Sequence, residues 1–188
     1  MKKRCDWTTS DQIYIDYHDY EWGKPKHDDQ ELFEMLCLEG AQAGLSWITI
    51  LKRRENYRKA FDNFDPEVVQ GYDEEKIQET LQDEGIIRNK LKVRSVVTNA
   101  QAFLKVKEEF GTFDAYIWKF VGGKPVLNEW EKHADVPAST DESVKMSKDL
   151  KKRGFKFVGP TICYAYMQST GMVNDHTKEC FLYHAGRG

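Results

Sequence analysis

The chain has 188 residues, of which 40% are hydrophobic and 31% are charged. This length and composition suffice for one well-packed domain or two small lobes, and they exclude an intrinsically disordered protein. The net charge of −3 excludes a protein that is basic over its whole surface, but it places no limit on local basic patches.

Three features bear on the cellular compartment. The sequence contains no apolar run of membrane-spanning length, and its first residues, MKKRCDWTTSDQ, lack the apolar stretch of a signal peptide. Its four cysteines are scattered over nearly the whole length, unlike the framework of a small disulfide-rich secreted protein. We therefore expect a cytoplasmic protein whose cysteines are free thiols or metal ligands.

Helical signals begin with residue 28. Residues 28–44 open with the capping pattern Asp28-x-x-Glu31 and carry apolar residues at helical spacing. Ser46 is positioned to cap a second helix over residues 46–61. Asp65 before Pro66 predicts the start of a third, because an aspartate cap with proline at the first helical position is a common helix start.

Helical signals continue to the end of the chain. Asp73 begins a predicted short helix through Leu81, and residues 91–111 form a long one that Gly111 ends. A further helix is predicted over residues 112–123, and residues 122–138 look irregular. Two last helices are predicted, from Ser139 or Thr140 to Gly154 and from Gly159-Pro160 to about Gly171. No segment alternates convincingly as a strand would, so we predict an all-α protein of roughly eight or more short helices.

The segment EGIIRNK, residues 84–90, lies between two of these helices. A short helix, a tight turn with a glycine and a second helix make a helix-hairpin-helix, here over about residues 74–107, whose backbone N–H groups can bind a phosphate. Six basic residues and no acidic residue occur between positions 88 and 107: Arg88, Lys90, Lys92, Arg94, Lys105 and Lys107. This excess predicts contacts with the DNA backbone. A solvated helix face after an ordinary turn explains the same pattern, and spacing alone leaves both open.

Aromatic residues concentrate near the beginning of the chain. The chain has five tryptophans and nine tyrosines in all. Six of these residues fall within the first 47 positions: Trp7, Tyr14, Tyr17, Tyr20, Trp22 and Trp47. Large π faces with polar edges suit a pocket that stacks a flat ligand such as a flipped nucleobase. Aromatic core packing is the commoner use of such residues.

The position of Glu39 favours a ligand pocket over simple aromatic core packing. At helical spacing it shares a face with Leu32, Met35 and Leu36, so its carboxylate projects from an apolar surface. A carboxylate there is costly unless it receives hydrogen bonds. A base that carries an amino group and a positive charge would supply both a donor and a counter-charge.

His176 and Cys180 stand four positions apart, and Cys5 with His18 are the candidates for a second pair. Two cysteines and two histidines would make a closed tetrahedral zinc site of the structural kind, which would join the two ends of the chain. The spacing is weak as a motif, and it leaves open that no metal binds.

The other cysteines and histidines lack such partners in the sequence. Cys37 and Cys163 lie in apolar helical runs and are predicted to be small core residues. His27, His133 and His184 are expected at the surface.

Several long blocks resemble the bacterial 3-methyladenine-DNA glycosylase I family, which belongs to the helix-hairpin-helix glycosylase superfamily. The resemblance extends from about residue 3 to about residue 180 and is weakest near residues 128–136. It is carried by CDW, YHDYEWG, LFEMLCLEGAQAGLSWITILKRRENYRKAFDNFDP, EGIIRNKLK, LKKRGFKFVGPTICYAYMQ and GMVNDH.

The resemblance implies a single all-helical, two-lobed domain that acts in base-excision repair. Such an enzyme flips 3-methyladenine out of alkylated DNA and cleaves its N-glycosidic bond without a lyase step. By resemblance, the ligands of one structural zinc ion are Cys5, His18, His176 and Cys180. By the same resemblance, the base-binding residues are Trp7, Tyr14, Tyr17, Trp22, Glu39 and Trp47.

The leaving group limits the catalysis that is required. Methylation at N3 makes adenine cationic, so the base departs as a neutral molecule without a strong general acid. Trp47 can stack on the cationic base, which contributes about 2 kcal/mol in a desolvated site. Many superfamily relatives have a catalytic aspartate after the hairpin, whereas residues 89–107 here contain no carboxylate. Glu39 is therefore the catalytic candidate, for orienting water or base.

The expected partners are alkylated double-stranded DNA and, as product, free 3-methyladenine, with no membrane and with the protein as a monomer. Phosphate contacts are predicted at Gly85, Arg88, Lys90 and Lys92. The turn with Gly44 and Leu45 is predicted to enter the gap that the flipped nucleotide leaves.

Two other functional classes are compatible with parts of the sequence. A helix-hairpin-helix binding module would use the basic helix, but it has no need for an aromatic pocket with an embedded carboxylate. A zinc-dependent hydrolase needs an open metal position, which a set of four protein ligands does not leave. Release of free base from methylated DNA, with and without a chelator, distinguishes these classes.

Overall fold

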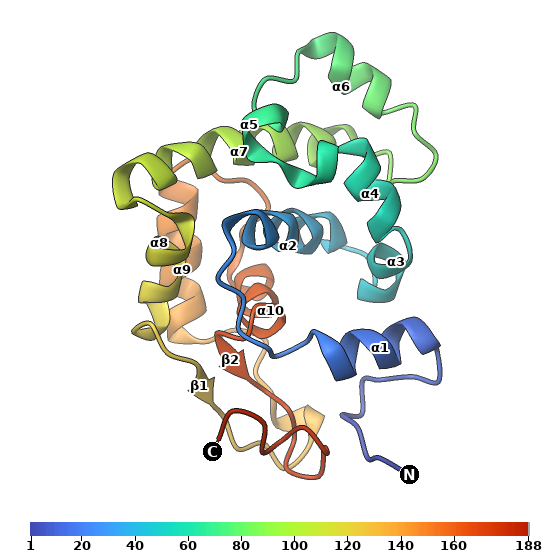
Figure 1. Cartoon of the computed structure of the whole chain (residues 1–188), viewed down its shortest axis with the longest axis vertical. Coiled ribbons are helices and arrows are strands. Elements are labelled where there is room, and N and C mark those ends of the chain that lie inside the picture. The colour runs from blue at the N-terminus through green and yellow to red at the C-terminus, as the bar shows by residue number, and fades with distance from the viewer. Residues whose placement is uncertain (188) are drawn as a thin grey trace.

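A computed structural model of the chain describes residues 1–187 and is mostly helical (Figure 1). The α-helices are α1 (Gln12–Tyr20), α2 (Asp29–Gln42), α3 (Trp47–Lys52), α4 (Arg54–Ala60), α5 (Pro66–Val69), α6 (Glu74–Thr80), α7 (Lys90–Phe110), α8 (Phe113–Trp118), α9 (Asp141–Lys152) and α10 (Pro160–Ser169). Short 3-10 helices are η1 (Asp62–Phe64), η2 (Lys119–Val121) and η3 (His133–Asp135), and the strands are β1 (Val126–Leu127) and β2 (Val173–Asn174).

Local capping signals set most helix starts. Asp28 accepts a hydrogen bond from the backbone N–H of Glu31, and Asp65, Asp73 and Thr140 cap α5, α6 and α9 in the same manner. Each cap satisfies one of the N–H groups that a helix start leaves without a partner. The helix starts predicted at these four positions are confirmed.

Several local features differ from the sequence-based expectation. Helix α1 was not predicted, and Ser46 begins α3 without a side-chain cap hydrogen bond. The predicted helix over residues 46–61 is two helices, α3 and α4, broken at Arg53 with φ −102° and ψ 2°. The guanidinium of Arg53 donates to the carbonyl of Glu84 in the loop before α7, at 3.1 Å. In addition, β1 and β2 pair in parallel, with Val126 opposite Val173, so the segment around residue 126 is held by partners distant in sequence.

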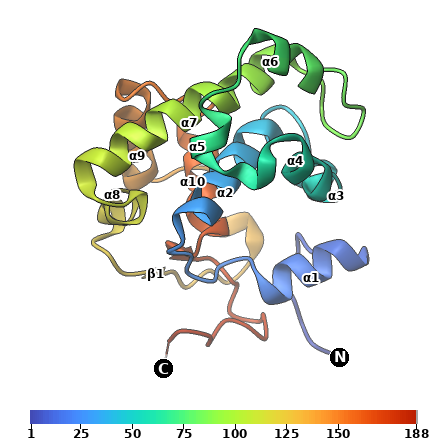
Figure 2. The same ribbon diagram turned by 45° about the horizontal axis from the view of Figure 1, so that its top comes forward.

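Helix α2 is the centre of the fold. All its residues from 32 to 41 are buried, and α2 packs against α3, α7, α8 and α10. Figure 2 shows α7 crossing over the central helices, and α7 also packs against α5 and α8. A helix that is buried on every side is positioned by packing and has little freedom to shift.

A second, smaller hydrophobic cluster joins the two ends of the chain. Cys5, Tyr17, Trp22, Leu51 and Cys180 are its buried members, and Trp47 packs against both this cluster and the main core. The ends also meet through the backbone, where the N–H of Phe181 donates to the carbonyl of Lys3 at 2.9 Å. No helix within residues 1–187 is both long enough and apolar enough to cross a bilayer.

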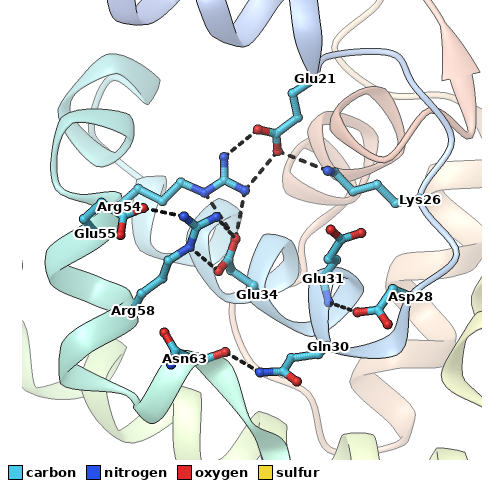
Figure 3. A network of polar contacts seen from close by, with 10 residues as sticks. All are labelled: Glu21, Lys26, Asp28, Gln30, Glu31, Glu34, Arg54, Glu55, Arg58 and Asn63. Atoms are coloured by element: carbon cyan, nitrogen blue, oxygen red, sulfur yellow. Dashed lines mark hydrogen bonds and ion pairs between the residues drawn. The ribbon is translucent and has the colours of Figure 1, made fainter.

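An ionic network fastens α4 to α2 (Figure 3). Arg54 donates to both carboxylate oxygens of Glu21, at 2.6 and 2.9 Å, and to Glu34 at 2.8 Å. Arg58 donates to the other oxygen of Glu34 at 2.7 Å. Burial alone would raise the pKa of Glu34, but the hydrogen bonds from Arg58 and Arg54 lower it below its usual range. Glu34 therefore stays ionised inside the protein.

We predict that Arg54→Met lowers the free energy of unfolding by about 3 kcal/mol. Glu21 and Glu34 lose the counter-charge that they share, and each keeps a single cation, Lys26 and Arg58 respectively. Arg94→Met is the matched control, since Arg94 pairs with Glu74 at the surface, where solvent screens the charges and the pair contributes little to stability. Urea unfolding followed by circular dichroism measures both variants. Equal losses in the two variants would show that the network does not hold α4 more firmly than a surface pair.

Candidate functional site

A cavity of about 230 Å³ lies between the small cluster and the end of α2. The six residues predicted to bind a base all line it: Trp7, Tyr14, Tyr17, Trp22, Glu39 and Trp47. They come from the N-terminal segment, α1, the loop after α1, α2 and α3. The fold thus brings this predicted set together in one place, while its role in base binding stays a prediction.

The aromatic rings of the cavity hold one another in place. Trp7 meets Trp22 edge to face with ring centroids 5.0 Å apart, and it meets Tyr14 at 5.4 Å. Tyr17 and Trp47 are 5.6 Å apart at a tilt of 51°. Edge-to-face contacts of this kind fix ring orientation. The walls are therefore formed before any ligand enters.

Two polar atoms of the cavity residues have no partner among residues 1–187. The indole N–H groups of Trp7 and Trp47 are buried and donate to no acceptor. A buried donor left unpaired costs about 1 to 3 kcal/mol. A ligand with acceptor atoms, such as the ring nitrogens of a purine, would remove that cost.

Glu39 is the buried acid of the cavity. Its residue is only 4% exposed, and burial raises the pKa of its carboxyl to about 8, an effect that the Ser169 hydroxyl offsets in part. At neutral pH the carboxyl therefore holds its proton in the free protein. A cation bound beside it would favour the ionised form.

Tyr17 also keeps its proton in this environment. Burial raises the pKa of its phenol well above the usual range, and the nearby Glu39 raises it further. Its hydroxyl is available as a hydrogen-bond donor at the same wall as Glu39. The cavity thus offers both donors and acceptors to a polar, flat ligand.

The sequence analysis missed several cavity residues. Gln42, His133, Ala165 and Gln168 also line it. His133, from η3 in the irregular segment, is exposed as expected and lines the cavity as well. Gln42 lies three positions after Glu39 on α2, so helical spacing could have indicated it. Nothing local in the sequence marks His133, Ala165 and Gln168, because they reach the cavity only through the folding of α10 and of the segment before α9.

The orientation of Gln168 is fixed by Asp175. Its side-chain amide donates to one carboxylate oxygen of Asp175 at 2.9 Å. Asn128 and Trp130 donate to the other oxygen at 2.7 and 2.8 Å. The segment before η3 is thereby attached to the wall of the cavity, and the amide N–H₂ of Gln168 is committed to Asp175.

The four predicted metal ligands converge. One ligand atom from each of Cys5, His18, His176 and Cys180 lies within 4.8 Å of the others, and all four residues are buried. The Cys180 sulfur is 3.5 Å from both His18 Nε2 and His176 Nδ1. Sulfur and nitrogen ligands at about 2.3 and 2.0 Å from a tetrahedral zinc ion would lie about 3.5 Å apart. The cluster can therefore hold a metal ion.

The second nitrogen of each histidine supports this arrangement. His18 Nδ1 is 2.8 Å from a carboxylate oxygen of Asp19, and His176 Nε2 is 3.1 Å from the carbonyl oxygen of Trp22. Both partners are acceptors, so these nitrogens carry the proton. The nitrogens that face the cluster then present lone pairs, as metal ligands must.

The residues predicted to contact DNA fall into two places. Gly44 and Leu45 lie in the turn between α2 and α3, where Gly44 has φ +78° and Leu45 is 37% exposed. Arg88 and Lys90 are exposed at the start of α7 and Gly85 lies in the preceding loop. Within residues 1–187 the backbone N–H groups of Arg88, Lys90 and Leu91 donate to no atom.

Lys92 is placed differently from its neighbours. Its ammonium donates to the carbonyl oxygens of Ala41 and Ala43 at 2.9 and 2.5 Å. The charge that the sequence suggests for phosphate binding is thus engaged with the end of α2.

Known proteins of similar sequence and structure share one name. A family model described as methyladenine glycosylase matches residues 7–183. The DNA-3-methyladenine glycosylase 1 of Escherichia coli (strain K12) is 49% identical over 181 residues, covering 96% of this chain and 97% of the relative. A crystal structure of 3-methyladenine DNA glycosylase I superposes with a TM-score of 0.92 at 50% identity, over 95% of this chain and 98% of the other. A variant of 3-methyladenine DNA glycosylase I in complex with 3-methyladenine gives a TM-score of 0.92 at 36% identity, over 95% and 96% of the two chains.

We predict that Glu39→Gln changes how stability depends on pH. Between about pH 4.5 and about pH 8 the folded protein keeps a proton on Glu39 that the unfolded chain has lost. The unfolded state then binds fewer protons, so the free energy of unfolding falls as pH rises through this window. Glutamine cannot ionise, so the variant should gain on the order of 3 kcal/mol relative to the parent between pH 5 and pH 8.

Thermal or urea unfolding at several pH values measures this difference. Glu31→Gln, an exposed glutamate in the first turn of the same helix, controls for the loss of a carboxylate. Parallel pH profiles for the parent and Glu39→Gln would mean that the Glu39 carboxyl is not held protonated by burial.

Proposed function

Since the chain belongs to the methyladenine glycosylase family of DNA repair enzymes, we propose that it releases 3-methyladenine from alkylated double-stranded DNA. The reaction is hydrolysis of the N-glycosidic bond after the nucleotide has flipped into the cavity. The observation that carries this proposal is the buried carboxyl of Glu39 at the wall of an aromatic cavity.

The cavity suits a cationic, flat base. Trp47 offers a π face to the positive ring, and Glu39 can accept a hydrogen bond from the exocyclic amino group. The unpaired indole N–H group of Trp7 can donate to a ring nitrogen. A neutral, unmethylated adenine lacks the positive charge and gains less from the same walls.

Glu39 can also take up the proton that hydrolysis releases. Water adds to the sugar as hydroxide, the bond to the base breaks, and one proton remains. While the cationic nucleotide is bound, its charge favours the ionised Glu39. Once the base leaves as a neutral molecule, burial again favours the protonated form. The change in charge of the base thus sets the protonation state of Glu39 at each stage.

The residues that line the described cavity support a monofunctional enzyme. A lyase step requires an amine nucleophile that forms a Schiff base with the sugar. The cavity lining in residues 1–187 contains no lysine. Water is then the nucleophile, and the product is an abasic site.

We place the DNA at the α6–α7 hairpin and the turn between α2 and α3. The free N–H groups at the start of α7, together with Arg88 and Lys90, suit phosphate oxygens. Leu45 is an exposed apolar side chain that can fill the gap in the base stack. The chain would act as a monomeric single domain of two helical lobes, with the hairpin at about residues 74–107. Its cytoplasmic location stays a prediction.

For the cluster of Cys5, His18, His176 and Cys180 we propose one zinc ion. With four protein ligands the ion would supply structural cross-linking of the chain ends and no open coordination position for catalysis. The distances between the ligand atoms and the committed second nitrogens of both histidines support this choice.

Glu39→Gln should slow the release of 3-methyladenine from methylated DNA by tens to a hundredfold. One charge-assisted hydrogen bond in a dry site corresponds to about 2 to 3 kcal/mol. Free 3-methyladenine should bind more weakly to the same extent, while affinity for undamaged DNA stays unchanged. Single-turnover excision assays and calorimetric titration with the free base measure these effects. A glutamine variant that excises at the parental rate would make Glu39 a structural residue and remove the basis of this proposal.

For the metal, we expect about one zinc ion per chain by elemental analysis. Cys180→Ser should lose the ion and lower the melting temperature, whereas Cys163→Ser, a change at another buried cysteine, should keep it. The folded fraction of Cys180→Ser should still excise base, because the ion takes no part in the reaction. Metal-free protein with the full melting temperature would end this claim.

A further inference from the structure

The ammonium of Lys92 connects two parts of the molecule that are distant in sequence. It belongs to the first turn of α7, and it donates to the carbonyl oxygens of Ala41 and Ala43. These carbonyls lie at the end of α2, where the last turn of a helix has oxygens without intrahelical partners and carries partial negative charge. The contact satisfies two of them.

The position of Lys92 on its own helix is otherwise unfavourable. A positive charge in the first turn is repelled by the positive end of the helix dipole. Burial also lowers the pKa of Lys92. The hydrogen bonds to the carbonyls at the end of α2 offset both the repulsion by the helix dipole and the cost of burial. They therefore fix the position of the Lys92 ammonium.

The carbonyls that Lys92 binds begin the turn that exposes Leu45. Gly44 follows Ala43 with φ +78°, a conformation that glycine adopts without strain. The turn is closed by two hydrogen bonds between Gln42 and Leu45, at 2.7 and 2.6 Å. Gln42 also lines the cavity. One ammonium therefore fixes the start of a turn that joins the cavity to an exposed apolar side chain.

We propose that Lys92 is a positioning residue that sets the distance between the phosphate-binding hairpin and the Gly44–Leu45 turn. This inference rests on the proposed function, in which the hairpin grips the backbone and Leu45 fills the gap in the stack. When the start of α7 engages phosphates, Lys92 places Leu45 at the nucleotide to be flipped. The lysine acts through the turn and does not itself neutralise a phosphate.

The test compares Lys92→Met with Lys90→Met. Both remove one positive charge from the first turn of α7, but Lys90 is exposed and makes no hydrogen bond through its ammonium within residues 1–187. Three quantities are measured: the single-turnover excision rate at saturating protein, the slope of log Kd against log salt on undamaged DNA, and the affinity for free 3-methyladenine. Fluorescence of 2-aminopurine beside an abasic analogue reports insertion of Leu45 without any excision.

For Lys92→Met we expect the excision rate at saturation to fall about tenfold or more, because a small misplacement of positioning groups is costly. The salt slope and the affinity for free base should stay unchanged, and the 2-aminopurine signal should fall. For Lys90→Met we expect the opposite pattern: the salt slope decreases by about one unit, and the 2-aminopurine signal at saturating protein keeps its parental value.

Coupling to Leu45 separates positioning from a general loss of stability. In a Leu45→Ala background, Lys92→Met should add little to the loss of excision, because the group it positions is already absent. Full additivity of the two changes would overturn the proposal. So would a Lys92→Met variant with a parental saturating rate and a reduced salt slope, which would make Lys92 a phosphate ligand.

Two further outcomes are informative. If Lys92→Met does not fold, Lys92→Gln keeps a donor without charge, and the same coupling to Leu45 is required of it. A parent protein that releases no 3-methyladenine would overturn the proposed function, whereas a parent that excises normally beside an unaffected Lys92→Met would overturn only this inference.

Discussion

The burial of α2 on all sides is the constraint from which the site follows. Any charged side chain on its inner turns must find a partner or change its protonation state. Glu34 and Glu39 lie five positions apart on this helix and reach opposite solutions. Glu34 receives two arginines and stays ionised, whereas for Glu39 burial is the dominant influence and raises its pKa to about 8. Near the start of α2, ion pairs attach Glu34 to α4. Near its end, burial raises the pKa of Glu39 into the range in which it can gain or lose a proton.

This division places stability and function at different parts of one element. The arginines of α4 hold the outer part of α2, so the inner part can present polar groups that are not satisfied internally. Such groups cluster at functional sites, because the surrounding structure can hold them there at a cost. The unpaired indoles of Trp7 and Trp47 belong to the same category. The cavity therefore holds buried polar groups that lack partners within residues 1–187, and a ligand could supply those partners.

Capping and spacing predict features that depend on neighbouring residues. Features that depend on distant residues were predicted only where the family resemblance supplied them, as for the cluster of Cys5, His18, His176 and Cys180. The caps at Asp28, Asp65 and Asp73 are local and were predicted correctly. The family resemblance assigned Glu39 and Trp47 to one pocket, and both line the cavity. The break at Arg53 was not predicted, because a carbonyl some thirty positions along the chain receives that side chain. Gln168 and His133 gave no signal either, since only tertiary packing brings them to the cavity. For Lys92, charge pattern alone cannot distinguish a phosphate from the carbonyl oxygens at a helix end.

The joining of the two chain ends has a consequence for biosynthesis. Trp7 and Trp22 are made early on the ribosome, but His176, whose ring packs against Trp22 with centroids 4.8 Å apart, is made among the last residues. Gln168, which lines the cavity, is also synthesised late. Since a chain is translated from its N-terminus and domains fold as units, the aromatic cavity cannot be complete in a nascent chain. The aromatic cavity would be complete only when translation is nearly finished, so a prematurely terminated chain carries Glu39 and the aromatic residues without the residues that enclose them.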